Sequence, residues 1–277
     1  MKMKKKKLIW HNIKVYNHNT ILNRIAFIQD NMLGLLPIYG HEKVVLKKYA
    51  EKNGIAVSEL FSMRNMIKIQ SEIVSSRKFH FYENKIVYKL NNLIKGLLES
   101  SDRQKNKAMI RHYLKTINMP FGQIYRTILK IPTYHDLHHT NKDYFNQISE
   151  LIREKEHISK ENSVAFEHML ENYFRQNNIA FKTETDIKNE NAGNYVATPD
   201  LLLDEELVLE LDNIQYKIKW IDAKNYMLID IPFIMKSLNK QSAKYNAIFG
   251  QGAFVFHYGL DSSIKIDGAV LLDGSFL

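Results

Sequence analysis

The residues of this chain best suited to chemistry are two aspartates and a lysine, in the strings Thr198-Pro199-Asp200 and Asp222-Ala223-Lys224. A hard cation such as Mg²⁺ prefers carboxylate oxygens and water, and it usually takes only one or two protein carboxylates, which leaves room for phosphate oxygens. An ammonium group beside such a metal can hold or deprotonate an attacking water. These residue types therefore favour hydrolysis of phosphodiester bonds at a Mg²⁺ or Mn²⁺ site.

Two segments with the pattern of strands must position these side chains. Residues 195–203 and 214–222 are rich in β-branched and aromatic residues and alternate with a period of two. We expect a hairpin between them that brings Asp200 near Asp222. Because residues two apart in a strand project to the same face, we expect the Lys224 ammonium beside Asp222.

A helix before the hairpin is expected to supply a third carboxylate. In residues 163–177 apolar side chains recur at helical spacing and define a stripe that packs on a sheet. At about 100° per residue, Glu167 lies at the edge of this stripe, whereas Glu171 is turned further toward solvent. We therefore predict Glu167 as the third acid.

The order of these residues resembles the PD-(D/E)xK nuclease superfamily, whose core is a mixed sheet flanked by helices. The string Gln241-Ser242-Ala243-Lys244-Tyr245 is similar to the Gln-x-x-x-Tyr signature of its RecB-like branch. Together with the Thr-Pro-Asp triplet and the glycine-containing aromatic segment 249–259, the pattern resembles the TPD-motif family. The resemblance covers residues 161–258 well and the first half of the chain only loosely.

The resemblance implies a metal-dependent nuclease acting on DNA in preference to RNA. The three carboxylates would bind Mg²⁺ or Mn²⁺, and the lysine would orient the water and stabilise the transition state. The glutamine and the tyrosine would shape the site or contact the nucleic-acid backbone, unless the tyrosine is structural and packs on the sheet. The predicted catalytic set is Glu167, Asp200, Asp222, Lys224, Gln241 and Tyr245.

Two other interpretations stay open. The aspartates can be surface residues at strand ends, with the lysine a solvated charge. The nuclease fold can also be retained as a catalytically silent adapter that binds nucleic acid or protein, and the resemblance then implies a codanin-like partner. Metal binding separates an enzyme from an adapter, because an adapter does not need acids that converge beside a lysine.

Composition is consistent with an intracellular nucleic-acid enzyme. The chain has 277 residues, 45% of them hydrophobic, and no cysteine, which excludes a disulfide framework and a cysteine nucleophile. No apolar run has transmembrane length, so we expect no membrane association. The lysine-rich leader, residues 1–7, favours neither the nucleus nor the cytoplasm, and it leaves a viral origin open.

Charge is divided unevenly along the chain. Residues 1–159 carry a net charge of +15 and residues 160–277 carry −6, which together make the +9 of the whole chain. A domain that binds a nucleic-acid backbone concentrates Lys and Arg, and a metal-binding domain concentrates acids. The alternative is that the lysine excess reflects an AT-rich genome.

The first half is expected to be all helical, with two units that resemble helix-turn-helix motifs. One would comprise residues 41–51 and 57–70, and the other residues 106–115 and 120–129. Helix, short turn, helix is also the common way to build any helical bundle. If the second helices bind nucleic acid, the exposed cations predicted to contact it are Arg64, Lys68, Arg126 and Lys130.

These patterns together predict an α/β (α+β) chain of two domains. Residues 1–150 would form the helical, nucleic-acid-binding region and residues 160–277 a restriction-endonuclease-like core, with the boundary in a polar stretch between them. The elements expected in that core, besides the hairpin, are a helix at 161–177, a strand at 180–185, a short strand at 207–211, a helix at 232–249 and strands at 253–258 and 268–272.

Overall fold

The computed structural model describes residues 6–32, 40–190 and 197–277. Residues 1–5 of the lysine leader and residues 195–196 of the first predicted strand lie outside this part of the chain. In chain order the described elements are β1 (Lys7–Trp10), β2 (Val15–Tyr16), α1 (His18–Met32), α2 (Gly40–Lys52), α3 (Val57–Leu98), α4 (Arg103–Ile117), α5 (Phe121–Ile128), η1 (Pro132–Asp136), α6 (His139–Gln176), β3 (Phe181–Thr183), α7 (Glu184–Glu190), β4 (Leu201–Leu211), β5 (Ile214–Lys224), α8 (Pro232–Phe249), β6 (Gly252–Phe256), β7 (Leu260–Asp261) and β8 (Ala269–Asp273).

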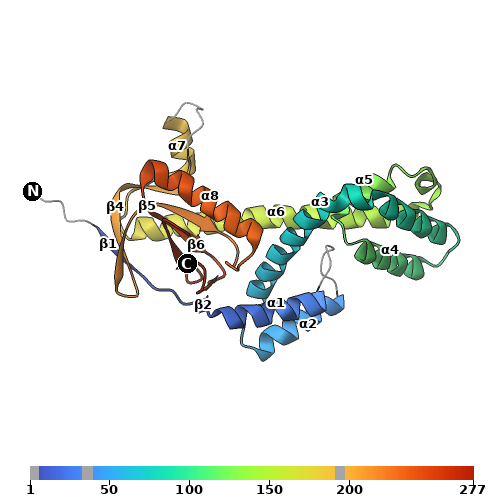
Figure 1. Cartoon of the computed structure of the whole chain (residues 1–277), viewed down its shortest axis with the longest axis horizontal. Coiled ribbons are helices and arrows are strands. Elements are labelled where there is room, and N and C mark those ends of the chain that lie inside the picture. Colours follow the sequence, from blue (N-terminus) through green and yellow to red (C-terminus); the bar gives the residue numbers. More distant parts are fainter. Residues whose placement is uncertain (1–5, 33–39, 191–196) are drawn as a thin grey trace, which may run out of the picture. The chain divides into compact units, whose positions relative to one another are not determined.

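The main sheet is mixed, as predicted. Its strand order is β1-β4-β5-β6-β8, with β3 paired to β4. The pairs β4–β5 and β3–β4 are antiparallel, and the other pairs are parallel. Helix α8 crosses one face (Figure 1), and the end of α6 packs on the other face through Phe166, Leu170 and Phe174. The sheet is therefore sandwiched between helices.

The hairpin β4–β5 is longer and simpler than expected. Residues 201–203 of the first predicted strand and the predicted strand 207–211 belong to one strand, β4, and residues 197–200 before it are not strand. The pairing of β4 with β5 is interrupted by a shift in register between Leu202 and Leu207. The turn falls at Asp212 and Asn213, which have φ values of 50° and 63°. Two consecutive residues with positive φ form the tight turn whose twist matches a hairpin.

The connection from β5 to the parallel strand β6 runs through α8, whose bounds agree with the predicted 232–249. Proline at the start suits the first turn, where no backbone donor is needed. After the helix, the chain enters β6 at Gly252, which pairs with Trp220. A Cβ atom at Gly252 would lie 2.1 Å from the Trp220 ring, so only glycine lets the indole lie flat on the strand.

A second core lies among the helices. Buried residues of α3, α4, α5, η1 and α6 form one apolar cluster, with Leu90, Ile110, Ile124 and Phe145 at most 1% exposed. Both predicted helix pairs are present, but α3 continues to Leu98 instead of ending near residue 70. Helix α6 likewise begins at His139, where a polar linker was expected, because its polar stretch is the exposed face of a long helix.

The chain forms two compact units, and one boundary between them falls at residues 159 and 160, where the predicted core begins, but the N-terminal region is shared between both units. The sheet unit contains the described parts of residues 6–27, 50–63 and 160–277, and the helical unit contains the described parts of residues 28–49 and 64–159. The N-terminal region is therefore not all helical, because β1 pairs in parallel with β4 and buries Leu8 and Trp10. A four-residue strand whose partner lies far along the chain has no local signal. None of the described helices is long and apolar enough to cross a membrane.

Candidate active site

The hairpin brings the two predicted aspartates together. Leu201 pairs with Ile221, so Asp200, just before β4, lies opposite Asp222 on β5. The backbone N–H of Ala223 donates a 2.6 Å hydrogen bond to Oδ2 of Asp200. Asp222 itself is only 3% exposed. Two carboxylates thus share one end of the hairpin, one of them deeply buried.

The environment of the pair disfavours the ionised form of Asp200. Burial and then the charge of Asp222 raise the pKa of Asp200 far above its ordinary value, and Glu167 adds to the effect. The hydrogen bond from Ala223 and the charge of Lys224 act in the opposite direction without cancelling the rise. A positive charge placed next to Asp200 would favour its ionised form and would itself be stabilised by it.

Lys224 lies where the alternation of the strand predicts. Its ammonium forms an ion pair with Oδ1 of Asp222, two residues earlier on the same face of β5. The Nζ atom lies 5.3 Å from the centre of the Phe254 ring on the neighbouring strand β6. The lysine side chain is 15% exposed. Its charge is therefore held beside the aspartate in a largely dry environment.

Helix α8 contributes Gln241 and Tyr245 to the same carboxylate. Nε2 of Gln241 donates to Oδ2 of Asp222 at 2.6 Å, and the hydroxyl of Tyr245 lies 3.2 Å from that oxygen and 3.0 Å from the carbonyl oxygen of Thr198. The tyrosine ring also packs edge-on against Trp220, with centroids 5.0 Å apart. Tyr245 therefore combines the two predicted roles, since it packs on the sheet and touches the site.

Glu167, the predicted third acid, is electrostatically coupled to the two aspartates. Burial and then the charge of Asp222 raise the pKa of Glu167, which places this carboxylate within electrostatic reach of the pair. Glu171 is paired with Arg175 at 2.7 Å, and its side chain is 15% exposed, so it is less turned to solvent than expected. Within the described ranges, no three Asp, Glu or His side chains converge closely enough to form a complete metal site. The third acid is thus near the pair without joining it as a ready ligand.

The donor set fits a hard divalent cation. Carboxylate oxygens are the ligands that Mg²⁺ prefers, and one or two suffice when water and phosphate complete its coordination. Burial and then the charge of Asp222 raise the pKa of Asp200, and a bound cation would favour the ionised form of this carboxyl. Asp200 and Asp222 are therefore the residues that could hold a metal.

Two neighbours of the site were not predicted. Burial and then the charge of Asp222 raise the pKa of Tyr226, which follows Lys224 by two residues. Glu184, at the start of α7, accepts a 3.1 Å hydrogen bond from Thr198 and raises the pKa of Glu167. The alternation of β5 could have identified the tyrosine. The glutamate lies on a short helix where a strand was expected, so no pattern indicated it.

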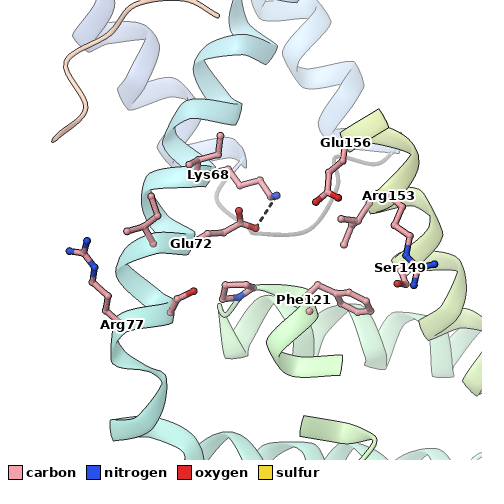
Figure 2. A pocket seen from close by; sticks show the side chains of 13 residues that line it. Lys68, Glu72, Arg77, Phe121, Ser149, Arg153 and Glu156 are labelled. Atoms are coloured by element: carbon pink, nitrogen blue, oxygen red, sulfur yellow. Dashed lines mark ion pairs between the residues drawn. The ribbon is translucent and has the colours of Figure 1, made fainter. Parts of the chain in front are cut away.

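The four predicted nucleic-acid contacts differ in exposure. Arg64 is a correction, because it is only 6% exposed, one helical turn after the buried Leu60 on α3. Lys68 lines a cavity of about 620 Å³ in the helical unit, where its ammonium lies 2.9 Å from Glu72 (Figure 2). None of the residues that line this cavity belongs to the predicted catalytic set. Arg126 and Lys130 are exposed, as predicted.

Comparison with known proteins gives two matches. Residues 136–274 match the model of a family described as "Protein of unknown function TPD sequence-motif". The chain is also 38% identical over 270 residues to "Uncharacterized protein L539" of Acanthamoeba polyphaga mimivirus, a match that covers 98% of this chain and 96% of the viral protein. No solved structure matches the chain significantly.

Proposed function

The chain belongs to the TPD sequence-motif family, and from the site at the end of the β4–β5 hairpin we propose that it is a divalent-metal-dependent nuclease acting on DNA. The observation that carries the proposal is the pair of the half-buried Asp200 and the buried Asp222 beside Lys224. A structural salt bridge needs one acid for one base, whereas this site holds a second acid whose charge is disfavoured.

We also propose a PD-(D/E)xK, restriction-endonuclease-like assignment for the sheet unit. Its support is the order of elements: the end of α6, the antiparallel hairpin β4–β5, the helix α8 and the parallel strand β6. The predicted catalytic residues lie on these elements, or in the case of Asp200 just before β4, in the order that the superfamily implies. Gln241 and Tyr245 lie on the helix after the Asp-x-Lys strand, as the RecB-like signature implies.

In this proposal, Asp200 and Asp222 would hold Mg²⁺ or Mn²⁺, with Glu167 assisting. When bound, such an ion would lower the pKa of its coordinated water and neutralise negative charge on the phosphate. Lys224 would exchange its contact with Asp222 for the attacking water or a phosphate oxygen, and the dry environment strengthens its electrostatic effect. Gln241 and Tyr245 hold the carboxylate of Asp222 in one orientation through Oδ2.

The test is cleavage by the purified full chain, with Mg²⁺ or Mn²⁺, of single-stranded, duplex and branched DNA and of RNA. We expect metal-dependent cleavage that falls by about 10²–10⁴-fold in Lys224→Ala and Asp222→Ala. Lys217→Ala is the matched control, because Lys217 is an exposed lysine on the same strand. Cleavage that survives both site substitutions would refute the mechanism. RNA as the preferred substrate would correct only the choice of nucleic acid.

One observation favours a silent adapter as the second candidate. Both oxygens of Asp222 already accept contacts from Lys224, Gln241 and Tyr245, so this carboxylate is satisfied without a metal. Calorimetric titration with Mn²⁺ separates the two functions. Uptake that is lost in Asp200→Asn supports the nuclease, whereas no uptake with or without DNA supports an adapter for nucleic acid or for a codanin-like protein.

The cellular setting is part of the proposal. The mimivirus relative, which the match covers over 96% of its length, is a viral protein. We propose an intracellular site of action, in the nucleus or the cytoplasm, where a nuclease of this kind meets DNA. Fractionation of cells that express the tagged full chain tests this placement.

A further inference from the structure

The middle of α3 exposes aromatic side chains that a helix normally buries. Phe81 is 85% exposed, Tyr88 67% and Tyr82 47%. The same helix buries Ile86 and Leu90 in the core of the helical unit, so its amphipathic pattern is otherwise ordinary. The helix already has a buried face, so these exposed aromatic side chains do not contribute to its packing. A cluster of exposed apolar side chains often marks a binding site.

Three lysines lie among these aromatic side chains. At about 100° per residue, Lys78, Lys85, Lys89 and Tyr82 fall within an arc of roughly 60°. Phe81 and Tyr88 adjoin this arc on the side away from the core. The surface formed by these six residues is called the lysine–aromatic stripe below.

No acidic residue of α3 lies on the stripe. The acids nearest to it along α3 are Glu72 and Glu83, and both project roughly 120–140° away from Lys78. Lys78 and Lys85 are exposed and form no ion pair with any described residue. The positive charge of the stripe is therefore available to an external anion.

A groove runs beside the stripe. Its volume is about 310 Å³, and it lies between α3 and the turn from α4 to α5, residues 116–119. Lysine and tyrosine side chains of the stripe line one wall, and no Asp or Glu lines the groove. The ammonium of Lys89 donates to the carbonyl oxygen of Thr116 at 3.1 Å, which holds one lysine at the edge of the groove. In the turn, Asn118 caps α4 in the left-handed conformation with φ of 49°, and its backbone N–H donates to the carbonyl oxygen of Leu114.

We propose that the lysine–aromatic stripe binds single-stranded nucleic acid. Lysines neutralise phosphates, and exposed aromatic rings stack on bases whose faces are free. A duplex hides the faces of its bases, so it would leave Phe81 and Tyr88 without a partner. The inference deepens the proposed nuclease function, on which it rests for the choice of nucleic acid as the polyanion. It assigns a substrate class to the helical unit and uses none of the four cations predicted from sequence.

The first test measures binding without cleavage. A labelled single-stranded oligothymidylate is titrated with the full chain in EDTA and followed by fluorescence anisotropy at several salt concentrations. Each phosphate contact contributes about 0.7 to the slope of log affinity against log salt for single strands. We expect Lys78→Gln/Lys85→Gln/Lys89→Gln to reduce the slope by about 2. The matched control, Lys95→Gln/Arg103→Gln/Lys105→Gln, removes three exposed charges elsewhere on α3 and α4 and should change it little.

The second test isolates stacking. Phe81 is so exposed that its replacement does not disturb the core. We expect Phe81→Leu to weaken single-strand binding about tenfold and Phe81→Trp to retain it, because tryptophan keeps the stacking surface. A duplex of the same length should bind more weakly and be indifferent to Phe81→Leu.

Several outcomes would overturn the assignment. Two of them are an unchanged salt slope in the triple-glutamine variant and equal affinity of Phe81→Leu and the parent chain for the single strand. The others are tighter binding to duplex than to single strand, and competition by polyglutamate that equals competition by unlabelled single strand. The tests are separable from the nuclease proposal. Binding that responds to the variants without any metal-dependent cleavage refutes only the nuclease, whereas cleavage by a chain whose binding ignores them refutes only the stripe.

Discussion

Nε2 of Gln241 donates a 2.6 Å hydrogen bond to Oδ2 of Asp222, which joins α8 to the central strand β5 at the candidate site. The same amide lies 2.9 Å from the Tyr245 hydroxyl, so two residues one helical turn apart act on one carboxylate oxygen. The helix therefore sets the orientation of the aspartate, and the ion pair with Lys224 occupies the other oxygen.

Replacing Gln241 by leucine should reduce metal-dependent cleavage about 10- to 100-fold. A hydrogen bond to a charged acceptor contributes about 1.5–3 kcal/mol, and its loss lets the carboxylate rotate. The measurement is the initial rate of cleavage of labelled DNA, together with Mn²⁺ affinity by calorimetry. Lys240→Ala, at an exposed position on the same helix, serves as the control. A Gln241→Leu chain with the parent rate and metal affinity would show that the contact is structural only.

Glu167→Gln should lower cleavage while leaving stability unchanged or slightly higher above about pH 5. Burial and the charge of Asp222 raise the pKa of Glu167, so its ionised form costs the folded chain stability that glutamine does not. Glu171→Gln is the matched control, four residues away on α6. It weakens the contacts of Glu171 with Arg175 and His168 on the same helix, where an i,i+4 ion pair is worth about 0.3–0.5 kcal/mol, and should cleave normally. Equal rates for the two variants would remove Glu167 from the site.

Asp200→Asn should stabilise the metal-free chain increasingly as pH rises. Burial and then Asp222 raise the pKa of Asp200 above 3.8, so the folded chain binds this proton more tightly than the unfolded chain. The stability that the proton contributes is fully present below about pH 4 and is lost as pH rises through the raised pKa. Thermal unfolding of both chains from pH 4 to pH 9 should show a widening gap in Tm. Mg²⁺ should narrow the gap by stabilising the parent chain, and a gap independent of pH contradicts the charge argument.

Gly252→Ala should destabilise the sheet unit by about 1–3 kcal/mol, because a methyl group at this position overlaps the Trp220 ring. Urea unfolding followed by tryptophan fluorescence measures the loss. Gly122→Ala is the control, since a Cβ atom there meets nothing within 4 Å and alanine favours the helix. Equal stability of Gly252→Ala and the parent chain would mean that the indole can move aside at no cost.

Much of the sheet unit could be predicted from local pattern. Helix α8 was predicted at its observed bounds, and the pairing of Asp200 with Asp222 followed from two strands with a turn between them. The preference for Glu167 over Glu171 followed from helical phase alone. These features rest on periods of 2 and 3.6 residues, which local sequence carries.

Features that depend on distant partners could not be predicted. Strand β1 was missed because it is short and pairs with β4 from the other end of the chain. The buried position of Arg64 was missed because the pattern does not say which face of a long helix meets another element. The predicted core 160–277 begins where one compact unit resumes, but its partners from residues 6–27 and 50–63 were not predicted, because their contacts lie far along the chain.

The sequence by itself determined which residues could do chemistry and on which local elements they lie, because residue type, turn signals and periodicity are properties of neighbouring positions. Only the tertiary structure decided that Asp200 lies beside the buried Asp222 with a raised pKa, that Gln241 and Tyr245 act on one oxygen, and that Phe81 and Tyr88 remain exposed on α3. Burial and charge coupling are set by atoms brought together from distant parts of the chain, and local sequence does not specify them.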